Sequence, residues 1–94
     1  VENDVVPQAF SLDQNYPNPF NPTTSISFTL SKVENVSLTV YNIIGQEVAL
    51  LVNGQMNAGL HVVTFNAAKL ASGIYFYRLQ TGDFVAIKKM VMLK

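Results

Sequence analysis

The sequence predicts an all-β fold, an antiparallel β-sandwich of about seven short strands. Three observations support this prediction. Several segments alternate apolar and polar residues with the period of two that a half-buried strand shows. Turn residues recur roughly every 8–12 residues, which is the spacing typical of sandwiches. No segment carries the apolar period of a long helix.

The clearest strand is expected at 25–31, where Ile26, Phe28 and Leu30 share one face and serine or threonine occupies the other. This is the pattern of an antiparallel strand with one buried face. Further strands are expected at 9–12, 36–41, 47–52, 60–65, 74–80 and 84–93, of which the last is the longest.

Turn residues separate these segments. Asn53-Gly54 is the strongest local turn signal in the chain, and a loop is expected to follow it as far as Gly59. Gly45 supplies the conformational freedom for an earlier turn. The remaining connections are expected at 32–35, at 67–73 with one helical turn around Leu70, and at 81–83.

The composition indicates one domain with an unusually apolar surface. The chain of 94 residues suffices for one modest core. Apolar residues make up 49% of it and charged residues only 13%, below the usual quarter or so. Few charges remain for the surface, so we expect a partner or a neighbouring domain to cover part of it. An edge-paired or strand-swapped dimer is one such arrangement.

Charge and cysteine content exclude several functional classes. Six basic residues balance six acidic ones, so the chain has no electrostatic footprint for nucleic acid or an anionic membrane. Cysteine is absent, so disulfides and thiolate metal sites are excluded. No apolar run approaches the ~20 residues that a membrane span needs.

Residues 1–8 are expected to be a linker, and residues 9–94 the domain. The linker shows no period and carries Glu2 and Asp4. No signal peptide is visible, and Val1 is not a natural start. We therefore expect the chain to be a piece of a longer protein, joined by 1–8 to an upstream domain.

The titratable residues do not form a catalytic pattern. His61 is the only histidine, and a lone histidine near a strand end is more often structural than a general base. No second histidine, cysteine or acidic loop accompanies it. We therefore predict no enzyme activity, no metal and no cofactor. The acids lie in the lead-in, in turns or at strand ends: Glu2, Asp4, Asp13, Glu34, Glu47 and Asp83.

Residues 15–22 hold three of the four prolines and are expected to form a stiff, extended segment. Tyr16-Pro17 is a candidate cis bond. The rings of Tyr16 and Phe20 could pin the segment onto an edge of the domain. Alternatively, they could join Tyr41 and Phe76 in a sugar-stacking platform of an accessory module. The sequence favours edge packing, because it has no tryptophan for stacking.

Tyr75 points to an immunoglobulin-like sandwich. It follows a short loop and begins the penultimate strand, where such folds carry a tyrosine corner. In that corner the hydroxyl bonds back to the backbone just upstream. The alternative is an inward aromatic whose hydroxyl reaches water.

The last strand is apolar on both faces and carries Lys88, Lys89 and, at its end, Lys94. Apolarity on both faces indicates either a central strand or an edge strand that something else covers. Lysines discourage edge-to-edge aggregation. A final strand is also a natural handle for a receptor that adds a strand to it.

Four separated blocks, in order, resemble the type A C-terminal sorting domain of the type IX (Por) secretion system. The blocks are 15–24, 40–48, 70–79 and 88–94, and the resemblance spans roughly 10–94. The pattern is also similar to the immunoglobulin-like domain of flagellar hook-capping proteins. The family's short motifs fall on Pro17-Asn18-Pro19, on Gly73-Ile74-Tyr75, and on Lys88-Lys89 with Lys94.

The resemblance implies an immunoglobulin-like sandwich on proteins exported by Bacteroidetes-type Gram-negative bacteria. Such a domain crosses into the periplasm with its cargo and is recognised by the type IX outer-membrane translocon. A sortase-like peptidase commonly removes it, here upstream of the fold, and the cargo is released or anchored at the cell surface. The alternative reading is an accessory carbohydrate-binding or spacer module of a secreted enzyme.

Overall fold

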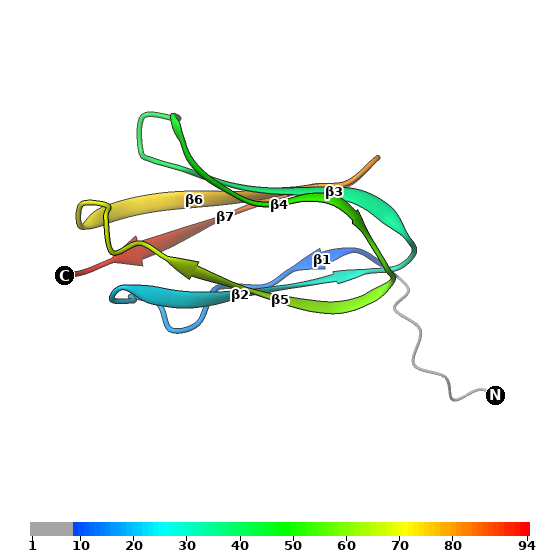
Figure 1. Ribbon diagram of the computed structural model, residues 1–94, viewed down its shortest axis with the longest axis horizontal. Helices are drawn as coiled ribbons and strands as arrows, with labels where there is room; N and C mark the ends of the chain where they lie inside the picture. The colour runs from blue at the N-terminus through cyan, green and yellow to red at the C-terminus, as the bar shows by residue number, and fades with distance from the viewer. Residues whose placement is uncertain (1–8) are drawn as a thin grey trace.

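The computed structural model describes residues 9–94 and folds them into two antiparallel sheets packed face to face (Figure 1). One sheet has three strands in the order β1-β2-β5, and the other has four in the order β4-β3-β6-β7. This confirms the predicted all-β sandwich of seven strands. The strands are β1 Ser11–Leu12, β2 Thr23–Leu30, β3 Glu34–Tyr41, β4 Glu47–Met56, β5 Gly59–Asn66, β6 Gly73–Gln80 and β7 Val85–Met92.

The core forms where the inward side chains of the two sheets meet. Ile26, Phe28 and Leu30 of β2 are all fully buried, as their alternation with serine and threonine predicts. From the opposite sheet, alternate residues of β3, β6 and β7 face them. These are Val36, Leu38, Val40, Tyr75, Tyr77, Leu79, Met90 and Met92.

The prediction of a turn at Asn53-Gly54 is wrong. Both residues lie inside β4, where Asn53 pairs with Ser37 and Gly54 with Val36. An Asn-Gly turn joins two strands of one hairpin, whereas β4 and β5 belong to different sheets. The chain therefore stays extended until β4 has matched the whole length of β3, and it crosses between the sheets after Met56.

Some smaller predictions differ from the structure. Residues 67–73 contain a turn in which the Leu70 N–H donates to the Ala67 carbonyl (2.9 Å), and no helix forms there. The last strand has eight residues and β4 has ten, so β7 is not the longest. It is an edge strand, which is one of the two arrangements that its apolar faces indicated. Residues 1–8, the predicted linker, lie outside the described residues.

Candidate functional site

The proline segment, residues 15–22, runs along the outer edge of β7. The Asn18 Oδ1 accepts a hydrogen bond from the Val91 N–H (3.0 Å), and the Phe20 N–H donates to the Val91 carbonyl (2.9 Å). The Leu93 N–H then donates to the Phe20 carbonyl (3.0 Å). Just before the segment, the Gln14 side chain donates to the Lys89 carbonyl (2.7 Å). The edge from Lys89 to Leu93 is therefore closed by the chain itself.

This closure changes the expectation for the last strand. Alternate residues of a strand direct their hydrogen-bonding groups to the same side. The outward groups of Val91 and Leu93 are occupied, so a receptor strand could pair there only by displacing the proline segment. From Lys89 to Leu93 the edge is satisfied internally, so this part offers its side chains rather than its backbone to a partner.

The hydroxyl of Tyr77 fixes the start of the proline segment. It donates to the Asp13 carbonyl (2.7 Å) and accepts from the Asn15 N–H (2.8 Å). The ring is fully buried in the core. Burial raises the pKa of Tyr77 from 10.0 to about 12; the Asn15 hydrogen bond works against this, and the charge of Asp13 adds to it. One core residue of β6 thus positions the chain that covers β7.

A second group of hydrogen bonds holds the proline segment against β2. Asn15 is buried, and its side-chain amide donates to the Pro17 carbonyl (3.1 Å) and to Thr24 Oγ1 (3.0 Å). The Thr24 hydroxyl donates to the same Pro17 carbonyl (2.8 Å). The backbones of Tyr16 and Ser25 exchange two hydrogen bonds at 3.0 Å. The segment therefore bridges the two sheets along one side of the sandwich. The peptide bonds before Pro17, Pro19 and Pro22 are cis.

Phe20 brings the three short motifs to one end of the molecule. Its ring is buried, 6.1 Å from the ring centroid of Phe65, and its backbone bridges to Met92. Met92 is the cross-strand partner of Gly73, where β6 begins. The Lys94 N–H donates to the Ser72 hydroxyl (2.9 Å). In Figure 1 the C-terminus, the start of β6 and the loop before β2 gather at the left-hand end.

Tyr75 is buried on the inner face of β6. Its hydroxyl donates to the carbonyl oxygen of Ala71, four residues upstream, at 2.6 Å. The contact ties β6 to the loop before it. The side chains of Tyr75 and Tyr77 thus act on different segments, one on the preceding loop and one on the lead-in.

The lysines of the tail, which we define as residues 88–94, form no ion pair with an acid among residues 9–94. Lys89 and Lys94 are exposed, and Lys88 is half-buried. Among residues 9–94, the one ion pair is between Lys32 and Glu34 (3.7 Å). Pro17, Asn18 and Pro19 are exposed beside this tail. Among the predicted sorting residues, the exposed ones are Pro17, Asn18, Pro19, Lys89 and Lys94, and we call these five the surface strip.

The four aromatic residues of the alternative sugar platform do not gather. Phe20 is in the core with 2% of its surface exposed, whereas Tyr16 is 81% exposed on the opposite side of the same segment. Tyr41 and Phe76 are cross-strand partners in the four-stranded sheet and are half-buried. In the structure Tyr41 and Phe76 are paired, whereas Tyr16 and Phe20 do not join them in one platform.

His61 makes packing and hydrogen-bonding contacts within the fold. Its ring stacks on Phe28 with centroids 5.4 Å apart, and Nε2 donates to the Asn57 carbonyl (2.7 Å). Residues 9–94 contain no cluster of three or more His, Asp or Glu side chains suited to a metal ion. Nor do they include a helix long and apolar enough to cross a membrane.

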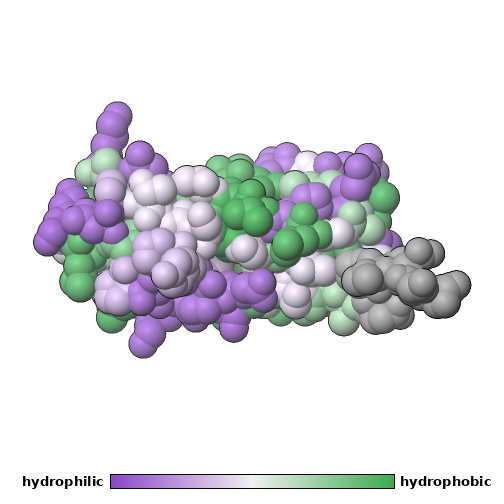
Figure 2. All heavy atoms as spheres, turned by 90° about the horizontal axis from the view of Figure 1, so that it is seen from below, coloured by the Kyte–Doolittle hydropathy of each residue, from purple (hydrophilic) through white to green (hydrophobic). Residues whose placement is uncertain are grey.

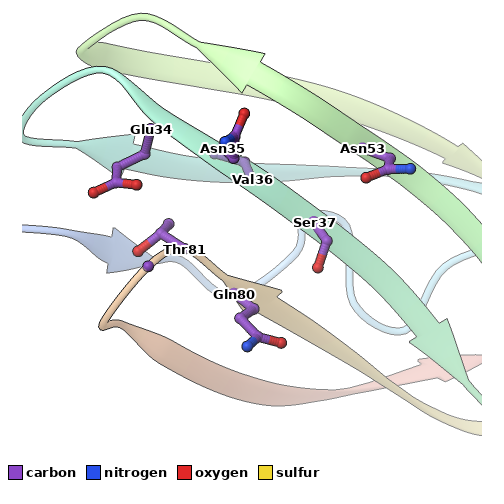
Figure 3. A pocket seen from close by; sticks show the side chains of 8 residues that line it. Glu34, Asn35, Val36, Ser37, Asn53, Gln80 and Thr81 are labelled. Carbon is purple, nitrogen blue, oxygen red and sulfur yellow. The ribbon is translucent and has the colours of Figure 1, made fainter.

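A polar recess of about 390 Å³ opens where β3 meets the β6–β7 hairpin (Figure 3). Glu34 supplies its one carboxylate, and neutral side chains of Ser37, Asn53 and Gln80 surround it. Thr81 Oγ1 is buried beside it with no hydrogen-bond partner. Glu34 is the one titratable side chain that lines this recess.

Sequence reasoning missed the residues that join the motifs: Gln14, Asn15, Thr24 and the hydroxyl of Tyr77. In 74–80 the sequence alternates so that Tyr77 shares a face with Tyr75 and Leu79. A buried tyrosine hydroxyl normally needs a hydrogen-bond partner, which was the available signal. Its partners are backbone groups more than sixty positions earlier, and no local pattern indicates them.

The fold defines a class: a small all-β sandwich of two antiparallel sheets, consistent with an immunoglobulin-like domain. A comparison with protein families identifies it further. The model of the secretion system C-terminal sorting domain matches residues 14–93, and the chain belongs to this family. No curated protein matches the sequence. The domain is thus a C-terminal sorting signal of type IX secretion, a route that leads through the periplasm to the cell surface or beyond.

Proposed function

We propose that this domain directs an attached cargo through the outer-membrane translocon by presenting the proline segment and the tail as one recognition unit. The supporting observation is the pairing at Val91. Its N–H is bound by Asn18 and its carbonyl by the Phe20 N–H. Asn18 and Val91 are 73 positions apart, so the two motifs form one unit only in the folded domain.

The residues proposed to be recognised are those of the short motifs. Gly73 and Tyr75 are buried or paired and serve to hold β6 and its preceding loop. The proposed contact residues are the exposed Pro17, Asn18, Pro19, Lys89 and Lys94, together with the half-buried Lys88.

The remaining partners follow from the family. We propose that residues 1–8 link an upstream cargo to the sorting domain at 9–94, and that a sortase-like peptidase cuts within or before this linker. The domain itself performs no catalysis in this account and needs no cofactor. A dimer formed by edge pairing would use β4, β5 or the part of β7 before Lys89, because the chain itself closes the edge from Lys89 to Leu93.

Export of a reporter fused upstream of the chain tests the recognition unit. The variant combines Lys89→Ala with Lys94→Ala, and the control combines Lys32→Ala with Lys69→Ala. All four lysines are exposed, and both variants remove two positive charges. In a type IX-competent host we expect the first variant to accumulate in the periplasm and the control to reach the medium or cell surface.

Stability and export are measured on the same variants, so that loss of folding is not mistaken for loss of recognition. Equal export of both lysine variants would contradict the assignment of the tail as the contact. Retention of the unmodified fusion in the periplasm would contradict the sorting function of this copy itself.

A further inference from the structure

The outer face of the β6–β7 ladder belongs to the two strands that carry the Gly73 motif and the lysine motif. Cross-strand pairing places Gln80 beside Val85, Arg78 beside Ile87, and Phe76 beside Lys89. Neighbours in an antiparallel pair project to the same face of a sheet. We define the β6–β7 face by the outward residues Ile74, Phe76, Arg78, Gln80, Val85, Ile87, Lys89 and Val91.

Large apolar side chains on this face are exposed to solvent. Ile87 is 59% exposed, Val85 52% and Ile74 36%, while Phe76 is half-buried between β3 and β7. They are adjacent rather than scattered, because they occupy neighbouring positions of one two-stranded ladder. Adjacent exposed apolar residues of this kind mark an interaction surface.

The charges on the face are all positive. Arg78 and Lys89 are diagonal neighbours in the ladder, a spacing of roughly 7–8 Å between backbone positions. None of the outward residues of β6 or β7 is acidic. Arg78 hydrogen-bonds to Tyr41 and Gln80, both neutral. In the same row of the sheet the nearest acid is Glu47 on β4, beyond Tyr41 and Phe76.

The opposite sheet provides the contrast. Figure 2 looks onto the side of the three-stranded sheet and shows mainly polar and near-neutral surface with an apolar patch. Ser25, Ser27 and Thr29 project outward from β2, and their neighbours on β5 are Thr64, Val62 and Leu60. None of these six side chains is charged. An apolar surface combined with unpaired positive charge occurs only on the β6–β7 face among these two sheets' ladders.

We propose that the β6–β7 face docks onto a protein surface of the secretion machinery that is apolar and carries at least one carboxylate. Charge complementarity selects this occupant. Two copies meeting through this face would bring Arg78 and Lys89 against the same cations of the partner, which is repulsive. The inference rests on the proposed sorting function, and it specifies which face of the folded domain is read.

Three variants in the exported reporter fusion test the docking face. Ile87→Glu places a negative charge at its centre, Ile87→Lys places a positive one there, and Val62→Glu is the control. Val62 is 60% exposed on an outward edge position of the other sheet, so it matches Ile87 in exposure and strand context. We expect Ile87→Glu to lower export about tenfold, equivalent to about 1.4 kcal/mol of binding. Val62→Glu should be exported normally, and Ile87→Lys should lie between the two.

Charge reversal at Lys89 is an independent variant in case Ile87→Glu does not fold. Lys89→Glu should lower export. Lys89→Arg keeps the positive charge and should be exported like the unmodified domain. Urea unfolding of each purified domain checks that the comparison is between folded proteins.

The outcomes separate the two claims. Export of Ile87→Glu and Val62→Glu at equal levels would overturn the docking face while leaving the sorting function intact. Failure of the unmodified fusion to be exported would instead overturn the sorting function. A dimer in sedimentation that Ile87→Glu dissociates, or binding of the purified domain to phosphatidylglycerol vesicles that Lys89→Glu abolishes, would replace the proposed occupant and so overturn the proposal.

Discussion

At the scale of single residues, Tyr77 connects the core to the surface strip. Its ring belongs to the core, and its hydroxyl both donates to Asp13 and accepts from Asn15. A buried phenol with two backbone partners is costly to replace, because its removal leaves a buried N–H without an acceptor. The position of the proline segment therefore depends on Tyr77, a fully buried residue.

Tyr77→Phe should lower the free energy of unfolding by about 2 kcal/mol, because Asn15 loses its acceptor in a buried site. The urea midpoint measures the change. Tyr75→Phe is the matched control and should cost only about 1 kcal/mol, since water can reach the carbonyl of the exposed Ala71. Equal midpoints for the two variants would contradict the role given to Tyr77.

The raised pKa of Tyr77 predicts a loss of stability in alkali. A group whose pKa is higher in the folded state stabilises the fold fully below its unfolded pKa. That contribution should fade as pH rises from the unfolded pKa of 10.0 towards about 12 in the fold. The stability difference between the unmodified domain and Tyr77→Phe should therefore shrink across this range in urea titrations. A constant difference from pH 9 to pH 12 would contradict the assignment.

At the scale of elements, the proline segment acts as a short strand for the edge of β7. It takes the outward groups of Val91 and Leu93, and Gln14 just before it takes the Lys89 carbonyl, so the edge from Lys89 to Leu93 is not available for pairing with other chains. The sequence predicted a stiff segment holding an edge. It could not indicate which edge, because the partner strand lies at the other end of the chain.

Asn18→Ala should fray this edge. Loss of the Oδ1 acceptor leaves the Val91 N–H without its partner, so its amide hydrogen exchange should accelerate. Asn21→Ala is the control, because it alters the same residue type in the same exposed segment. The amide of Tyr75, on the neighbouring strand, should be unaffected in both. Unchanged exchange at Val91 in Asn18→Ala would show that the side chain does not hold the edge.

The error at Asn53-Gly54 shows the limit of local patterns. The dipeptide favours a tight turn when its flanking segments can pair with each other. Here the preceding segment pairs with β3, and the segment beyond Gly59 pairs with β2. The pairing of β4 with β3 determines where β4 ends, and it outweighs the local turn propensity of Asn53-Gly54. The alternation at 25–31 and 74–80 was reliable because burial of one face is a property of the strand itself.

At the scale of the whole molecule, the sandwich brings together three motifs that are far apart in sequence. The residue types of the candidate site could be predicted from the sequence through resemblance to a family, but their contact could not. Gly73 pairs with Met92 across β6 and β7, and Met92 in turn forms a backbone bridge with Phe20 of the proline segment. Recognition and folding are therefore coupled in this domain.

Removal of residues 88–94 should consequently damage both properties. It deletes Met90 and Met92 from the core and removes the partners of the proline segment at Val91 and Leu93. The remainder of β6 would then be left with an unpaired edge. We expect the truncated domain to be unfolded and its cargo to remain inside the cell.

Export of a reporter carrying this truncated domain is the most direct test of the account. In a type IX-competent host, the account predicts that the reporter with the full chain reaches the cell surface or medium, and that the reporter lacking residues 88–94 stays in the periplasm. Normal export of the truncated fusion would contradict the claim that the folded domain, with its tail bound to the proline segment, is the sorting signal.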